Sequence, residues 1–83
     1  MSFVYVLRSA SGRLYYGSTT DLTRRLEQHE RGHTATTRRD APWVLAGSVE
    51  FGTLAEARAQ ERQFKYWKNP ARVMAWLNRH TTR

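Results

Sequence analysis

The chain has 83 residues, of which 14 are Arg or Lys and 7 are Asp or Glu, so its formal net charge is +7. The length predicts one domain over residues 1–83, and the absence of cysteine excludes disulfide bonds and a cysteine nucleophile. Most of the cations are arginine, whose planar guanidinium suits phosphate, so the composition favours nucleic acid as a partner. A ribosome-associated or merely basic soluble protein remains the alternative.

The N-terminal residues carry no basic leader and only a short apolar run, which is not typical of a signal peptide. Nothing in the sequence approaches the length of a membrane span. We therefore expect a soluble cytoplasmic protein without membrane contact.

Residues 3–7 are aromatic and β-branched, which predicts a strand buried on both faces. A turn cluster over 9–12 separates it from a second strand over 13–17, so the two form a hairpin. Side chains alternate between the faces of a strand. Tyr15 should therefore share a face with Gly17, and Tyr16 should lie opposite.

Asp21, or Thr20 before it, can cap a helix that continues to Gly32. Arg25 and His29 are four residues apart and should lie on the same side of this helix, one turn from each other.

Residues 32–42 form a polar, basic loop that is long for a structural connector in so small a domain. We expect it to contact a ligand, with Arg38 and Arg39 as its charged contacts.

Residues 43–51 predict a third strand. Thr53 and Glu56 match a capping box that opens a second helix, which runs to about Lys68. Asn69 and Pro70 then end it and begin a third helix. The order β-β-α-β-α-α predicts an α+β fold with a small three-stranded antiparallel sheet flanked by three helices.

Glu61 falls on the apolar side of the second predicted helix. A carboxylate there is costly to bury unless it is paired or binds a metal, and magnesium takes only one or two protein carboxylates. The alternative, which position alone favours, is an ordinary helical ion pair with Lys65 at the rim of the core.

The remaining candidates each allow two interpretations. Arg25 could clamp a phosphate oxygen and His29 could relay a proton, or they could be a solvated charge and a packed ring. Tyr5 and Tyr15 could take part in proton transfer beside a cation, although cross-strand packing is the commoner role of strand tyrosines. Gly17 either admits a ligand close to the backbone or simply ends the strand.

The motifs Phe3-Val4-Tyr5 and Tyr15-Tyr16-Gly17, followed by Arg25, His29 and Glu61, resemble the GIY-YIG nuclease superfamily. The resemblance covers residues 3–68, and it is closest to the short, single-domain bacterial members of the YhbQ-like (UPF0213-type) group. Phe3 replaces the glycine of the first motif, and Tyr16 replaces the aliphatic residue of the second.

The resemblance implies a divalent-metal-dependent endonuclease that hydrolyses DNA phosphodiester bonds, with a possible preference for single-stranded or branched DNA. Glu61 would bind one Mg²⁺ or Mn²⁺ ion, Arg25 would neutralise charge on the phosphate, and Tyr5 would help to deprotonate water. Tyr15 or His29 would orient that water. The expected DNA contacts are Gly17, Arg24, Arg38, Arg39 and Lys65.

Two other functions fit the same residues. The protein could be a nucleic-acid-binding module without cleavage, or a nuclease subunit that is active only with a protein partner. The sequence leaves the oligomeric state open.

Overall fold

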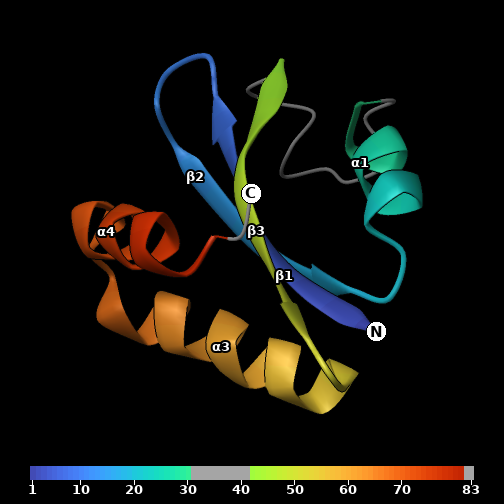
Figure 1. Ribbon diagram of the computed structural model, residues 1–83. Coiled ribbons are helices and arrows are strands. Elements are labelled where there is room, and N and C mark those ends of the chain that lie inside the picture. The colour runs from blue at the N-terminus through green and yellow to red at the C-terminus, as the bar shows by residue number, and fades with distance from the viewer. Residues whose placement is uncertain (31–41, 82–83) are drawn as a thin grey trace.

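The computed structural model describes residues 1–30 and 42–81. Within these residues the chain forms three strands and three helices, which Figure 1 shows in chain order. The elements are β1 (Ser2–Ser9), β2 (Leu14–Thr19), α1 (Leu22–Glu30), β3 (Trp43–Phe51), α3 (Leu54–Trp67) and α4 (Pro70–His80). The α+β fold and the predicted order of its elements are confirmed.

The sheet is antiparallel, with the strand order β2-β1-β3. The hairpin turn between β1 and β2 contains Gly12 at a φ of 90°, a conformation that costs glycine little. In the register of this hairpin, Tyr5 is the partner of Gly17. Because β1 is the central strand, both of its edges pair with a neighbouring strand. Its four most buried side chains are at most 2% exposed: Val4, Tyr5, Val6 and Leu7.

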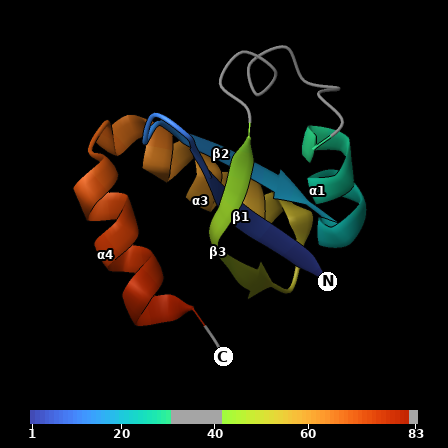
Figure 2. The ribbon, with the colours of Figure 1, turned by 90° about the horizontal axis from the view of Figure 1, so that it is seen from above.

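The helices cover both faces of the sheet. In Figures 1 and 2, α3 and α4 lie on one side of the strands and α1 lies on the other. The first face forms the hydrophobic core, whose buried members are Val4, Val6, Phe64, Val73 and Leu77. Burying one large apolar side chain contributes about 1.5–3 kcal/mol, so this core fixes α3 and α4 against β1. Alternation along the strand turns Tyr5 and Leu7 toward α1.

Each described helix begins at a polar cap. Asp21, rather than Thr20, caps α1, because its Oδ1 accepts the backbone N–H three residues later at 3.1 Å. Thr53 and Glu56 form the predicted capping box of α3. Asn69 caps α4 through a hydrogen bond of 3.1 Å to the backbone three residues later. One such cap typically stabilises a helix by about 1 kcal/mol, and together they fix where each helix leaves the sheet.

The predicted strands are confirmed with small changes of bounds: β1 extends one residue before and two residues after the expected range, and β2 begins one residue later and ends two residues later than expected. Gly17 therefore lies inside β2 and does not end it. The predicted helix end at Gly32 and most of the 32–42 loop, with Arg38 and Arg39, lie outside the described residues. Within 1–30 and 42–81, no helix has both the length and the apolar character that crossing a membrane requires.

Candidate active site

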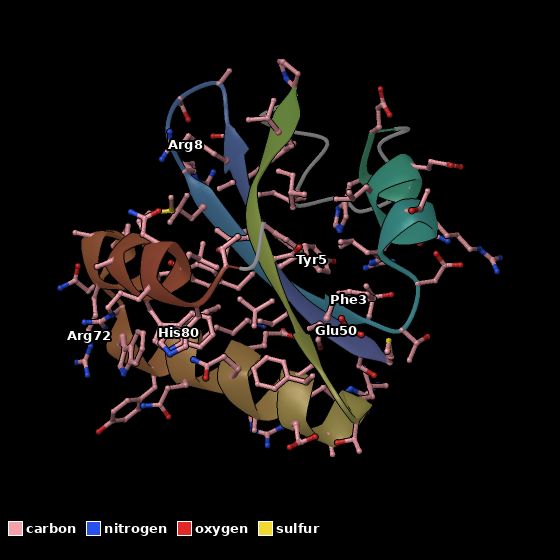
Figure 3. The ribbon with its side chains drawn as sticks, viewed as in Figure 1. Phe3, Tyr5, Arg8, Glu50, Arg72 and His80 are labelled. Carbon is pink, nitrogen blue, oxygen red and sulfur yellow. The ribbon has the colours of Figure 1, made fainter. Side chains whose placement is uncertain are left out.

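Three predicted site residues meet in a buried cluster between β1 and α1. The Tyr5 hydroxyl oxygen lies 2.9 Å from His29 Nε2, and Arg25 Nε donates a hydrogen bond to the same oxygen at 3.3 Å. Tyr5 is 1% exposed and His29 is 4% exposed. Figure 3 shows the Tyr5 side chain on the side of the sheet where α1 lies. We call these residues the Tyr5–Arg25–His29 cluster.

Local sequence explains why the cluster forms. Tyr5 alternates with the core valines of β1 and therefore points away from α3. The Asp21 cap sets the start of α1 directly after β2, and the spacing of four residues places Arg25 and His29 on one side of that helix. The sequence pattern thus brings all three side chains to the same face.

Burial controls the protonation of the cluster. Desolvation raises the pKa of Tyr5, and the hydrogen bond from Arg25 opposes this effect. Burial, followed by the charge of Arg25, lowers the pKa of His29. The hydrogen bond to Tyr5 raises the pKa of Arg25. At neutral pH the cluster therefore holds a phenol, a neutral imidazole and a guanidinium, and the Tyr5 hydroxyl can donate to His29 Nε2.

Tyr15 joins the cluster from β2. Its ring meets the ring of His29 edge-on, with the ring centroids 4.9 Å apart. It meets the Trp43 ring in the same way, with the centroids 6.2 Å apart. Interaction with the Tyr15 hydroxyl contributes to the raised pKa of Arg25. Tyr15 and Tyr5 thus both act on Arg25, and Tyr16 lies on the opposite face against Phe64, as predicted.

Gly17 provides the space in which the Tyr5 ring lies. A methyl group built on Gly17 would overlap the hydroxyl oxygen and Cζ of Tyr5 and would approach Cε1 to 2.8 Å. Gly17 is not among the residues with a positive φ, so space rather than backbone conformation requires a glycine here. No sequence pattern indicated this packing role, and contact between Gly17 and a ligand stays a prediction.

The Glu61 carboxylate is held at the edge of the sheet by two partners. Ser18 Oγ donates to Glu61 Oε1 at 2.6 Å, and Lys65 Nζ pairs with Oε2 at 2.8 Å. The expected alternative of a Glu61–Lys65 ion pair is therefore present, but the carboxylate is also tied to β2. Its side chain is 20% exposed, which leaves it accessible from one side. Its charge also acts on Tyr5, whose pKa it raises.

An open pocket of about 350 Å³ lies where α1, α3 and the end of β2 come together. Three arginines from two helices line it: Arg24, Arg25 and Arg58. Ser18 also lines it, so the residue that binds Glu61 belongs to the pocket wall. Sequence reasoning missed Ser18 and Arg58. A signal for Arg58 was available, because it lies three residues before Glu61 on the same helix.

The donor set suits a hydrated cation better than a closed metal cage. Within the described residues, no group of three or more His, Cys, Asp or Glu side chains could jointly hold a metal ion. Glu61 offers one carboxylate beside the Ser18 hydroxyl. That arrangement fits Mg²⁺, which typically takes one or two protein carboxylates and completes its shell with water and substrate phosphate.

The comparisons with known proteins show which family the chain resembles. The GIY-YIG catalytic domain family matches residues 1–74. A UPF0213 protein of Nitratidesulfovibrio vulgaris is 47% identical over 64 residues, which cover 76% of this chain and 58% of that protein. A UPF0213 protein of Streptococcus agalactiae is 36% identical over 80 residues, which cover 95% of this chain and 90% of that protein.

A solved structure shows the same fold. The solution NMR structure of a UPF0213 protein from Bacillus halodurans has a TM-score of 0.58 to this chain at 29% sequence identity. The match covers 94% of this chain and 84% of that protein. With the family match over most of its length, the chain belongs to the GIY-YIG family, a family of nuclease domains.

Proposed function

We propose that the protein is a divalent-metal-dependent endonuclease that hydrolyses DNA phosphodiester bonds. The observation that carries this proposal is one arginine-lined pocket whose wall contains both Arg25, which donates to the buried Tyr5, and Ser18, which binds the Glu61 carboxylate. Membership of a nuclease family supports the same conclusion.

The pocket is suited to a phosphate group. Arg24, Arg25 and Arg58 place three guanidinium groups around it, and these are the side chains best matched to phosphate oxygens. Arg25 donates one N–H to the Tyr5 hydroxyl and another to Gln28 Oε1 at 2.9 Å. Its remaining N–H groups are available for non-bridging oxygens, where negative charge grows as the phosphodiester bond breaks.

The Tyr5–Arg25–His29 cluster provides a path for one proton. Because Tyr5 has a raised pKa, a standing phenolate is disfavoured. The hydroxyl can instead accept a proton from the attacking water while its own proton passes to the neutral Nε2 of His29. The resulting hydroxide oxygen bonds to phosphorus, the bond to the leaving oxygen breaks, and His29 becomes an imidazolium. Since Tyr5 is 1% exposed, this water must enter with the substrate beside Arg25.

Glu61 would hold the divalent ion, which when bound polarises the phosphate and stabilises the leaving oxygen. Lys65 occupies one oxygen of this carboxylate and would give way to the ion or turn to a neighbouring phosphate. A preference for single-stranded or branched DNA, a protein partner and a cytoplasmic location stay predictions.

The proposal is tested by cleavage of labelled single-stranded, double-stranded and branched DNA with Mg²⁺ or Mn²⁺. Removing a group that stabilises transition-state charge typically lowers the rate about 100- to 1000-fold, so Glu61→Gln should reduce cleavage by at least that order. Glu50→Gln is the matched control, because Glu50 is exposed on β3, the strand farthest from β2.

Equal cleavage by the wild type and Glu61→Gln would refute the assignment of Glu61. If no metal and no substrate gives cleavage, while binding to DNA remains strong and falls steeply with salt, the protein is a binding module instead.

A further inference from the structure

The net charge of the chain is concentrated in its last 22 residues. All seven acidic residues lie at or before Glu61, together with eight of the 14 cations. Residues 62–83 hold the other six cations and no acid. The overall charge of +7 is therefore almost entirely a property of the second half of α3 and the segment that follows it. All residues that line the proposed active-site pocket come before residue 62, so the pocket does not explain the positive charge of residues 62–83.

Three exposed residues form a line along α3. Arg58, Arg62 and Tyr66 are spaced by four residues, so they lie one above the other on the solvent side of the helix. We call them the α3 stripe. Neither arginine takes part in an ion pair among the residues that the structure describes, whereas Lys65 beside them is paired with Glu61. The two guanidinium groups are thus available to an external anion.

Tyr66 is unusual in its surroundings. It is 80% exposed, although its neighbour Trp67 and the nearby Phe64 pack into the core. A large exposed aromatic ring contributes little to stability here, but its face can stack on a nucleic-acid base. Two further exposed cations follow it: Lys68 at the turn from α3 to α4, and Arg72 in the first turn of α4.

The α3 stripe continues directly from the pocket. Arg58 belongs to both, since it lines the pocket with Arg24 and Arg25. From Arg58 to Tyr66 the helix advances about 12 Å, at about 1.5 Å per residue. In Figure 1, α3 runs away from α1 toward α4, so the stripe leads from the pocket along one side of the molecule. Figure 3 shows Arg72 at the far end of this path.

We propose that the α3 stripe binds the single-stranded DNA that continues from the phosphate held in the pocket. Arg58 and Arg62 contact backbone phosphates, and Tyr66 stacks on an unpaired base. An unpaired strand is required because the bases of a duplex already stack on each other. This inference rests on the proposed nuclease function for the position of the reacting phosphate, but binding by the stripe can be measured without cleavage.

The experiment measures the affinity of a labelled oligothymidylate, long enough to cross pocket and stripe, over a series of salt concentrations in EDTA. For single strands the slope of log affinity against log salt is about 0.7 per phosphate contact, so Arg62→Gln should reduce the slope by about that amount. Arg13→Gln, which removes the same charge from the exposed hairpin turn, should leave the slope unchanged.

Tyr66 is tested separately from charge. Stacking contributes about 1–3 kcal/mol per base, so Tyr66→Ser should weaken binding roughly 5- to 150-fold without changing the salt slope. Tyr66→Phe keeps the ring and should bind like the wild type. On an oligonucleotide of the same length without bases, Tyr66→Ser and the wild type should bind equally. The three substituted side chains, Arg13, Arg62 and Tyr66, are exposed, so the substitutions should not disturb the fold. Thermal unfolding checks that each variant is folded.

The inference is overturned if Arg62→Gln and Arg13→Gln have the same salt slope, or if Tyr66→Ser binds as tightly as the wild type. If Arg62→Gln or Tyr66→Ser loses more affinity for duplex DNA than for single-stranded DNA, the choice of an unpaired strand is overturned. If the wild type cleaves nothing but the stripe variants still lose affinity, the nuclease proposal fails and the binding surface stands.

Discussion

Replacing Gly17 by alanine should destabilise the protein because the new methyl group competes with the Tyr5 ring for the same space. The methyl would overlap the hydroxyl oxygen and Cζ of Tyr5. Tyr5 cannot move outward freely, since it is 1% exposed and is held by His29 at 2.9 Å and Arg25 at 3.3 Å. Gly17 itself has no positive φ, so alanine introduces no backbone strain.

The expected cost combines two effects. Overpacking of a buried site costs about 1–3 kcal/mol, and each hydrogen bond of Tyr5 that is lost costs about 0.5–1.5 kcal/mol more. We therefore expect Gly17→Ala to lower the free energy of unfolding by about 2–4 kcal/mol, a large part of the roughly 4–12 kcal/mol typical of a chain this long. The melting temperature should fall by about 10–20 °C.

Urea unfolding followed by circular dichroism measures this cost in two backgrounds. With Tyr5→Leu the ring is gone, so Gly17→Ala should cost less than about 0.5 kcal/mol or even stabilise the protein, because alanine restricts the unfolded chain. Gly47→Ala is the matched control, since its methyl would meet Leu77 Cδ1 at an ordinary 3.4 Å. If Gly17→Ala lowers the free energy of unfolding equally in the wild type and in Tyr5→Leu, Gly17 is not required to make room for the Tyr5 ring.

Three further predictions concern the site. Because the pKa of His29 is lowered from 6.5, the unfolded chain binds its proton more readily, so the free energy of unfolding should fall as the pH drops below 6.5. Urea titrations at several pH values should show a smaller loss of this free energy for His29→Gln than for the wild type. Equal losses would show that His29 is not the cause. Lys65→Met frees Glu61 Oε2 from its ion pair. An exposed ion pair contributes about 0.2–1 kcal/mol, so calorimetry should show that the variant binds Mg²⁺ about 1.4- to 5-fold more tightly. Unchanged affinity would mean that Lys65 does not compete with Mg²⁺ for Glu61. Arg25→Lys keeps the charge but loses the Nε donor to Tyr5, so kcat should fall roughly 100-fold; a rise in KM alone would limit Arg25 to binding.

The helix starts and the order of the elements along the chain were predictable because they depend on local rules. Asp21, Thr53 and Asn69 are capping residues at the predicted positions, and the structure uses all three as caps. Strand ends were less accurate, because β1 and β2 gain residues from pairing with each other, which single-strand patterns do not record.

The candidate site was predictable only where its residues share one element. Arg25 and His29 lie on one side of α1 because of their spacing, and the sequence showed this. The hydrogen bond from Ser18 to Glu61 joins residues 43 positions apart, so it depends on how α3 packs against β2. No local pattern distinguishes Ser18 from an ordinary strand serine. The role of Gly17 likewise depends on the pairing of β1 with β2.

The position of β2 explains how two helices on opposite faces of the sheet can contribute to one site. Gly17 and Ser18 are consecutive, so they face opposite sides: Gly17 lies under Tyr5, on the side of α1, and Ser18 binds Glu61, on α3. In a central strand, neighbouring strands would separate these two sides. Because β2 is an edge strand, Arg25 from one layer and Ser18, which binds Glu61 of the other layer, line the same open pocket around its end. In the proposed reaction, the strand order β2-β1-β3, with the cluster built on β1 and β2, is therefore what would bring a guanidinium and a carboxylate from different layers to one phosphate.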